Sequence, residues 1–324
     1  MPSPAPSILT IGNFDGVHLG HAALVRRARA LADGDPSSPR VVALAFDPTP
    51  LSVLAPQKAP PVVSTFDQRR ELLLAHGADE VVRLEPTPEL LGATPEQFVD
   101  QLVERFAPVA IVEGPDFAFG RGRAGDVSTL AELGSLRGFT VDVVPPVTVA
   151  LDDQTVVVAS STVVRWLIEH GRSRDAARVL GRPYTLTGTV ARGDQRGRTL
   201  GFPTANLDTP LLLPADGVYA GLAALPDGRH FPAAVHVGPR DTFGLPARTL
   251  EPHLIGWDGP VAEGTDEYGW TLRVALLDWL RGQVRFSSAD ELVDQMTRDC
   301  ARAEETVRRA VDDAADSTAQ GAAR

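Results

Sequence analysis

Short apolar runs alternate with amphipathic stretches through the first half of the chain. The apolar runs have the length and β-branched content of buried strands and cover Ile8–Ile11, Val41–Phe46, Val81–Leu84, Val109–Val112 and Val141–Val144. Helical patterns lie between them at Ala22–Ala32, Asp67–His76, Pro95–Phe106 and Thr129–Leu136. This alternation predicts an α/β domain in which helices cover both faces of a parallel sheet, and ligands of such sheets bind at the carboxyl ends of the strands.

The pattern changes in the second half. Two short helices are expected at Ser161–His170 and Arg174–Leu180. Strand patterns separated by Gly/Pro-rich turns follow, at Tyr184–Val190, Gly217–Ala224, Ala233–Val237, Leu250–Ile255 and Thr271–Leu280. Many short strands without intervening helices predict a compact barrel or sandwich.

A helix closes the chain. Ser288 and Glu291 have the spacing of a capping box, and an apolar stripe with helical spacing runs from Leu292 to Val311. We place the domain boundary near residues 181–183. The expected organisation is a domain over 1–182, a domain over 183–316 and a disordered tail over 317–324.

Composition narrows the functional classes. The 324 residues suffice for two domains, and the net charge of −11 argues against a nucleic-acid binder or a membrane-surface protein. The first residues lack the pattern of a secretory signal, and no apolar run approaches the roughly 18 residues that span a bilayer. Cys300 is the single cysteine, which excludes internal disulfides and Cys-rich zinc sites. We expect a cytoplasmic protein without nucleic-acid or membrane partners.

Lysine usage excludes one large class of nucleotide-binding proteins. Lys58 is the only lysine and lies outside any Gly-Lys-Ser/Thr motif. The phosphate loop of P-loop NTPases needs that lysine to neutralise the terminal phosphates. The chain is therefore not a P-loop enzyme.

The first candidate site is the segment GNFDGVHLGH at residues 12–21, directly after the first apolar run. A Gly-rich turn at the end of a strand lets backbone N–H groups approach a phosphate, and the next helix N-terminus adds partial positive charge. His18 and His21 can donate hydrogen bonds to the same phosphates. A metal-binding pair and an ordinary surface turn are the alternatives; metal is the weaker one, because zinc sites use three or four protein ligands.

Further loops are expected at the same edge of the sheet. Residues 114–125 read GPDFAFGRGRAG, a flexible, Arg-bearing loop that follows the fourth strand. Residues 160–165 read SSTVVR and place hydroxyl groups at a helix start with an Arg one turn later. Each is ordinary by itself, as a loop or a helix cap. Together with the first segment they favour a triphosphate site.

The second candidate site is GDQRGRTLGFPTAN at residues 193–206. Thr204 and Asn206 lie two residues apart, so an extended backbone points both side chains to the same side. A hydroxyl and an amide carbonyl are hard oxygen ligands, which suit Mg²⁺ that is shared with ATP phosphates. The alternative is a β-turn that leads into a strand.

These motifs carry a resemblance to a known family. GNFDGVHLGH, FDPTP, GPDFAFG and SSTVVR are similar to the FMN adenylyltransferase half of bacterial bifunctional riboflavin kinase/FAD synthetases, and GRTLGFPTAN, GVYA and the segment 268–296 resemble the riboflavin kinase half. The resemblance implies a Rossmann-like nucleotidyltransferase domain, then a Greek-key β-barrel kinase domain with a C-terminal helix. It implies that riboflavin and ATP give FMN, and that FMN and ATP give FAD and pyrophosphate, with Mg²⁺ as cofactor.

The resemblance also implies roles for individual residues. In the first half, the catalytic pair is His18 and His21, and the residues that bind ATP or the departing pyrophosphate are Gly12, Phe14, Asp15, Gly16, Ser161, Thr162 and Arg165. The flavin or the adenine would face Asp116 and Phe117. In the second half, Glu251 is the implied base, Thr204 and Asn206 hold Mg²⁺, and the phosphate-binding residues are Gly193, Arg198 and Gly201. The flavin would be enclosed by Gly238, Thr242 and Phe243.

The chain departs from the family pattern at several positions. Thr49 replaces the usual His of FDPTP, and the kinase half carries His236 for Asn, Asp241 for Pro, Pro252 directly after Glu251 and an insertion over 256–267. These changes predict an active kinase with altered flavin contacts. The alternatives are a single-activity FMN adenylyltransferase with a degenerate kinase domain, and a non-catalytic flavin-binding regulator. Intact phosphate and pyrophosphate motifs favour the two-step enzyme.

Overall fold

The computed structural model describes residues 4–193, 197, 200–242, 245–258 and 267–322. The chain divides into two compact units: residues 1–150 with 156–161, and residues 151–155 with 162–324. The division falls within a helix, between Ser161 and Thr162. The segment 162–182, assigned to the first domain from the sequence, therefore groups with the second unit.

The first unit is built on a five-stranded parallel sheet in the order β3-β2-β1-β4-β7. Its strands are β1 (Ser7–Gly12), β2 (Arg40–Phe46), β3 (Glu80–Leu84), β4 (Pro108–Glu113) and β7 (Thr140–Val143). All five were expected from the apolar runs. The strand order reverses between β1 and β4, so the chain leaves these two neighbours in opposite directions along the sheet. Such a switch point is where open α/β sheets bind their ligands.

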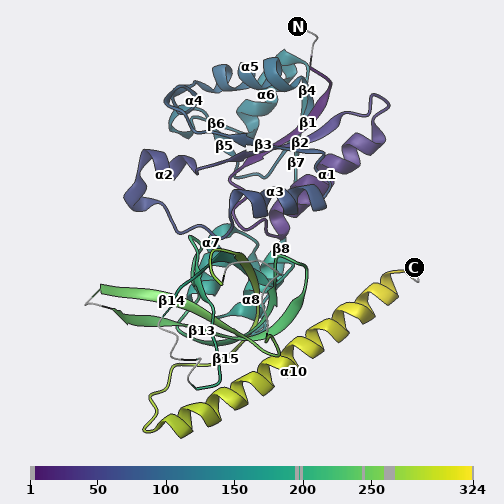
Figure 1. Cartoon of the computed structure of the whole chain (residues 1–324). Helices are drawn as coiled ribbons and strands as arrows, with labels where there is room; N and C mark the ends of the chain where they lie inside the picture. Colours follow the sequence, from purple (N-terminus) through teal and green to yellow (C-terminus); the bar gives the residue numbers. More distant parts are fainter. Residues whose placement is uncertain (1–3, 194–196, 198–199, 243–244, 259–266, 323–324) are drawn as a thin grey trace. The chain divides into compact units, whose positions relative to one another are not determined.

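Helices cover both faces of this sheet (Figure 1). One face packs against α1 (Leu19–Gly34) and α3 (Phe66–Ala75), and the other against α5 (Pro95–Phe106) and α6 (Val127–Arg137). Successive residues of β1 serve opposite faces: Ile8 joins the core under α1, and Leu9 joins the core under α5. The predicted apolar stripe of α5 is confirmed, because Phe98, Leu102 and Phe106 are all buried.

Short elements join the main ones. They comprise the helices α2 (Pro50–Leu54) and α4 (Pro88–Gly92), the 3₁₀ turns η1 (Pro56–Lys58) and η2 (Arg121–Arg123), and the hairpins β5 (Ala118–Phe119) with β6 (Gly125–Asp126) and β8 (Thr148–Ala150) with β9 (Val156–Val158). The sequence did not predict them, since two to five residues are too few to show a period.

The second unit contains a six-stranded antiparallel sheet in the order β11-β10-β15-β12-β13-β14. The bounds are β10 (Tyr184–Ala191), β11 (Asn206–Asp208), β12 (Gly217–Ala224), β13 (His230–Thr242), β14 (Leu245–Leu254) and β15 (Thr271–Arg281). The late strand β15 lies between β10 and β12, as in a Greek key. The backbone N–H of Ala205 donates to the carbonyl of Pro252 at 2.9 Å, which nearly closes the sheet into a barrel.

Helices complete the second unit. The expected pair is α7 (Ser161–Glu169) and α8 (Ser173–Leu180), and the C-terminal helix is α10 (Ala289–Ala322), drawn in yellow in Figure 1. Ala303 of α10 packs with Val218 and Leu280 of the barrel. Arg281 binds Asp299 of α10 at 2.7 Å, and Asp299 is buried. The helix continues to Ala322, where the sequence predicts a disordered tail; alanine-rich sequence favours helix at this end.

The predicted fold class is confirmed. An α/β unit with a parallel sheet precedes a nearly closed antiparallel barrel that carries a C-terminal helix. The candidate site residues are positioned by the reversal of strand order in the first unit and by the approach of β11 to β14 in the second.

Candidate functional site

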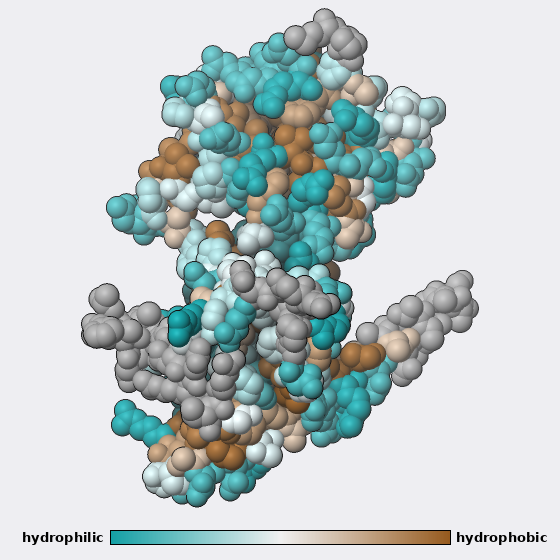
Figure 2. Space-filling view, viewed as in Figure 1, coloured by the Kyte–Doolittle hydropathy of each residue, from teal (hydrophilic) through white to brown (hydrophobic). Residues whose placement is uncertain are grey.

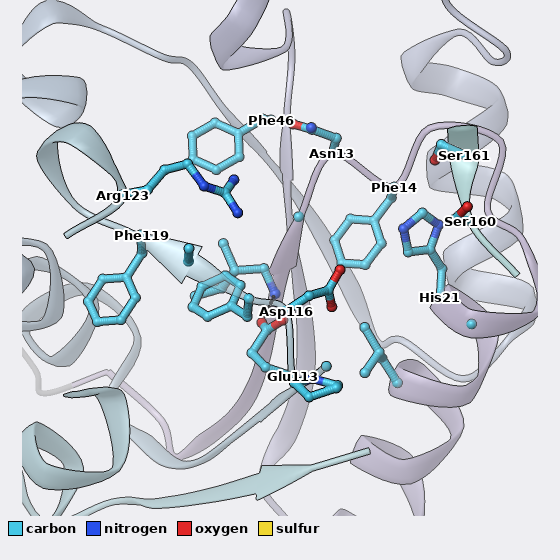
Figure 3. Close-up of a pocket in the computed structure, with 18 of the residues that line it drawn as sticks. Asn13, Phe14, His21, Phe46, Glu113, Asp116, Phe119, Arg123, Ser160 and Ser161 are labelled. Carbon is cyan, nitrogen blue, oxygen red and sulfur yellow. Dashed lines mark hydrogen bonds between the residues drawn. The ribbon is translucent and has the colours of Figure 1, made fainter. Parts of the chain in front are cut away.

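The first unit contains a large cleft at the switch point of its sheet. The cleft has a volume of about 1010 Å³ and is lined by the segments that follow β1 and β4, together with Pro145–Val147 and Val158–Ser161. The predicted loops 12–21, 114–125 and 160–161 therefore meet at one place. Figure 3 shows side chains from all three around the same space.

The turn after β1 has an unusual backbone. Phe14 (φ 49°), Gly16 (φ 81°) and Val17 (φ 40°) all have positive φ values, which are uncommon for residues other than glycine. Phe14 and Val17 are fully buried, so packing of their side chains holds the strained turn. The turn delivers the chain to His18, the N-cap of α1.

The two histidines of this turn form a stacked pair. The ring centroids of His18 and His21 are 3.7 Å apart with an interplanar angle of 25°, and Phe14 contacts the ring of His21 edge-on at 5.1 Å. Both histidines line the cleft (Figure 3 labels His21). Burial lowers the pKa of His21 well below its usual value, and the nearby His18 lowers it further. His21 is therefore a neutral imidazole in the free protein.

One ring nitrogen of His21 is buried among the described residues. The Nδ1 atom of His21 is buried and makes no hydrogen bond to any residue that the structure describes. An unsatisfied buried nitrogen costs free energy unless a ligand supplies the partner. Because both rings line the cleft, the pair is suited to a polar group that enters it.

The carboxylate of Asp15 is turned toward another loop. It accepts hydrogen bonds from the backbone N–H groups of Val63 and Ser64. The backbone N–H of Gly16 donates a hydrogen bond of 2.7 Å to the hydroxyl oxygen of Ser64. Asp15 is 2% exposed, and neither Asp15 nor Gly16 lines the cleft. These contacts tie the turn to the segment before α3. Binding of phosphate by Asp15 and Gly16 stays a prediction.

The segment SSTVVR is divided between the two units. The hydroxyl of Ser161 donates to the carbonyl of Asp15 at 2.7 Å, and Ser161 lines the cleft. Thr162 and Arg165 belong to the second unit. Their part in pyrophosphate binding stays a prediction.

The wall of the cleft that is formed by the segment after β4 is mainly apolar and also carries acidic side chains. Phe117 lines it and stacks on Phe119, with ring centroids 5.6 Å apart. Asp116 is exposed beside Phe117. The structure thus brings the predicted flavin residues to the same cleft as the histidines.

Apolar residues of α2 also line the cleft, and the sequence analysis missed them. Leu51 is 42% exposed and Leu54 is 68% exposed, and Figure 2 shows hydrophobic surface over this helix. Exposed leucines beside a cleft suit a planar aromatic ring. Thr49, where the family pattern has His, is the residue before α2 and is absent from the described lining.

A smaller hollow, of about 100 Å³, lies in the second unit. Its lining brings together three residues predicted from the sequence: Gly193, Thr204 and Asn206. A Cβ atom at Gly193 would overlap the side-chain amide of Asn206, so a larger residue there would displace this candidate ligand. The other lining residues include Trp257, Tyr268 and Trp270.

The candidate base lies on the strand beside this hollow. Glu251 belongs to β14, and the next residue, Pro252, accepts the Ala205 N–H that lies between Thr204 and Asn206. Strand β14 ends the order of the sheet, which agrees with the expectation that Pro252 needs an edge position. The cross-strand partner of Glu251 is His236.

The sequence also predicts flavin-binding and phosphate-binding residues elsewhere in the kinase half. Arg198 and Phe243 lie outside the described residues, as does most of the insertion 256–267. Gly201 has a positive φ of 84°, and Thr242 is the last residue of β13. Gly238 packs so closely on Gln283 that a Cβ atom would overlap it.

The donor atoms beside the hollow fit a Mg²⁺ ion that is shared with a bound phosphate group. Within the described ranges, no group of three or more His, Cys, Asp or Glu side chains could hold a metal ion. A hydroxyl and an amide oxygen from Thr204 and Asn206 are too few for an all-protein cage. They suit Mg²⁺ that takes its other ligands from phosphates and water.

Comparisons with known proteins agree with this geometry. A family model described as FAD synthetase matches residues 1–161, and one described as riboflavin kinase matches residues 180–307. The bifunctional riboflavin kinase/FMN adenylyltransferase of Escherichia coli K12 is 35% identical over 300 residues, which is 90% of each chain. The chain belongs to the bifunctional riboflavin kinase/FMN adenylyltransferase family. A relative of the same name from Pseudomonas fluorescens is 34% identical and covers 93% of both chains.

The fold of this chain is also found in a solved structure. A crystal structure titled as a macrolide-efflux protein from Streptococcus pneumoniae is 30% identical, with a TM-score of 0.79 and coverage of 95% of each chain. No helix in the described part of our chain has the length and apolarity that a membrane crossing requires.

Family membership decides between the readings of the sequence. The bifunctional transferase is favoured over a single-activity adenylyltransferase and over a non-catalytic regulator, because both halves match their own family and curated relatives span the chain. The sequence found the histidine pair, the GPDF loop and the Thr204/Asn206 pair. It missed Leu51, Leu54 and Glu113, which also line the cleft.

Proposed function

We propose that the cleft of the first unit is the FMN adenylyltransferase site, and that the hollow beside Thr204 and Asn206 is part of the riboflavin kinase site. The observation that carries the first assignment is the stacked pair of His18 and His21, both of which line the cleft at the end of β1. Because both reactions consume ATP, we place the enzyme in the cytoplasm.

In the adenylyl transfer, a phosphate oxygen of FMN attacks the α-phosphorus of ATP, and the bond to pyrophosphate breaks. Negative charge develops on the transferred group and on the leaving pyrophosphate. His18 and His21 donate hydrogen bonds to these oxygens. The bound triphosphate favours the charged form of imidazole, so the low pKa of His21 in the free protein does not prevent this role. Ser161, Thr162 and Arg165 hold the departing pyrophosphate.

In the kinase step, the terminal hydroxyl of the ribityl chain attacks the γ-phosphorus of ATP and loses its proton, and the bond from that phosphorus to the leaving ADP breaks. Glu251 accepts this proton and orients the hydroxyl. Thr204 and Asn206 would hold Mg²⁺, which when bound neutralises charge on the phosphates. The hydrogen bond between Ala205 and Pro252 supports this assignment, because it keeps the metal ligands and the base on adjacent backbone segments.

The assignment is tested by two substitutions whose effects should cross. His21→Ala should abolish FAD formation from FMN and leave FMN formation from riboflavin intact. Asn206→Ala should block FMN formation and leave the adenylylation of supplied FMN intact. Chromatography separates riboflavin, FMN and FAD, so both products are measured in one assay.

The matched control is His230→Ala, which removes an exposed histidine outside both sites. It should leave both activities at the wild-type level. If either test variant lost both activities in a folded chain, the assignment of separate sites would be wrong.

A further inference from the structure

A buried carboxyl group at the end of β4 takes no part in either proposed step. Glu113 is 2% exposed, yet it lines the cleft of the first unit. Its Oε1 atom accepts a hydrogen bond of 2.6 Å from the backbone N–H of Ile11 in the neighbouring strand. Figure 3 labels Glu113 below Asp116, between Phe119 and His21. The contact with Ile11 fixes the carboxyl group at the switch point of the sheet.

The second carboxyl oxygen faces the cleft. Among the residues that the structure describes, none forms a hydrogen bond with Oε2 of Glu113. Among the described polar atoms, Oε2 is one that solvent can still reach. Because Glu113 lines the cleft, Oε2 is open to the cleft. A ligand in the cleft can therefore reach it.

Burial of Glu113 favours the neutral acid form of its side chain. Burial raises the pKa of its carboxyl group well above the usual value; the hydrogen bond from Ile11 lowers it to a smaller extent, and the charge of Asp116 raises it again. The other titratable or charged side chains in the described lining are His18, His21 and Arg123. With Oε1 engaged as an acceptor, the proton of the acid is available on Oε2 as a donor.

We propose that Glu113 is a specificity-determining residue, whose neutral carboxyl group donates a hydrogen bond from Oε2 to an acceptor on the heteroaromatic ring of a substrate in the cleft. The inference rests on the proposed function of the cleft. The apolar lining near β4, with Phe46 and Phe117, suits a planar ring. Two substrates carry ring nitrogens or carbonyls of this kind: the adenine of ATP and the isoalloxazine of FMN.

Two substitutions separate donation from mere packing. Glu113→Gln keeps an acceptor for Ile11 and an N–H donor toward the cleft, so KM values for ATP and FMN should stay within about twofold of wild type. Glu113→Val removes both groups, and KM for one of the two substrates should rise by roughly ten- to a hundredfold. The substrate whose KM rises identifies the ring that Glu113 contacts. Glu132→Gln, on the exposed face of α6, is the matched control.

The pH dependence of KM shows whether the proton of Glu113 or only the shape of its side chain contributes to binding. In the wild type, the affected KM should rise as the pH passes upward through the raised pKa of Glu113, because the donor is lost and a buried charge appears. In Glu113→Gln this rise should be absent. Far-UV circular dichroism and riboflavin phosphorylation show whether each full-length variant is folded.

Three results would overturn the proposal: unchanged KM values in a folded Glu113→Val chain, a Gln variant as impaired as the Val variant, or a Gln variant with the pH profile of the wild type. Calorimetric binding of ATP and of FMN gives an independent readout. A wild-type chain that binds both ligands but forms no FAD would contradict the proposed function instead, and the binding constants of the variants would still decide the role of Glu113.

Discussion

At the scale of single residues, the first site depends on how closely the two imidazoles approach the start of α1. A Cβ atom at Gly20 would lie 3.0 Å from Cε1 of His18, 3.1 Å from its Nδ1 and 3.3 Å from the carbonyl oxygen of Ala159. Distances this short force a neighbour to move. A side chain between the histidines would therefore press on the His18 ring.

Gly20→Ala should lower FMN adenylylation by roughly ten- to a hundredfold, because it displaces His18 from the phosphates. Riboflavin phosphorylation should not change. The control is Gly34→Ala at the end of the same helix, where a Cβ atom would meet nothing within 4 Å. Equal adenylylation rates in the two variants would show that the ring position of His18 is unimportant.

At the scale of elements, α3 holds the carboxyl ends of two strands in place. The guanidinium of Arg69 donates to the carbonyl oxygens of Asn13 and Phe46 at 2.7 and 2.8 Å, and to Asp47 at 2.5 Å. Arg69 is 4% exposed, so these contacts are shielded from water. One buried cation thus links the turn after β1 to the turn after β2, and both turns border the cleft.

Arg69→Met should lower the free energy of unfolding of the first unit by about 2–4 kcal/mol, because it removes the donor of the Asn13 and Phe46 carbonyl groups and leaves Asp47 with Arg83 alone. Urea unfolding followed by circular dichroism measures this change. Arg70→Met alters the next residue, which is exposed, and should cost less than about 0.5 kcal/mol. Similar losses in both variants would mean that Arg69 does not link the strands.

Elements with a clear period could be predicted from the sequence, and so could the motifs at their ends. Strands β1 and β4 and helix α5 agree with the apolar pattern, and the histidine pair was found because glycine and histidine are unusual there. Glu113 could not be found this way, since one acidic residue after an apolar run looks like the end of a strand. Its burial depends on the neighbouring strand β1, which only the tertiary structure supplies.

At the scale of the whole molecule, each compact unit carries its own set of phosphate-binding candidates. The cleft of the first unit has the histidine pair, and the barrel has Thr204 and Asn206 beside β14. Two sites of different chemistry in one chain fit two successive reactions, in which the product of the kinase is the substrate of the adenylyltransferase. Each site should therefore work when the other is inactive.

Mixing the two single-site variants tests this requirement most directly. His21→Ala and Asn206→Ala are each incubated with riboflavin, ATP and Mg²⁺, alone and in an equimolar mixture, and FAD is quantified by chromatography over time. We expect no FAD from either variant alone, and FAD from the mixture, because FMN released by the first variant is adenylylated by the second. A mixture that accumulates FMN without forming FAD would contradict the account.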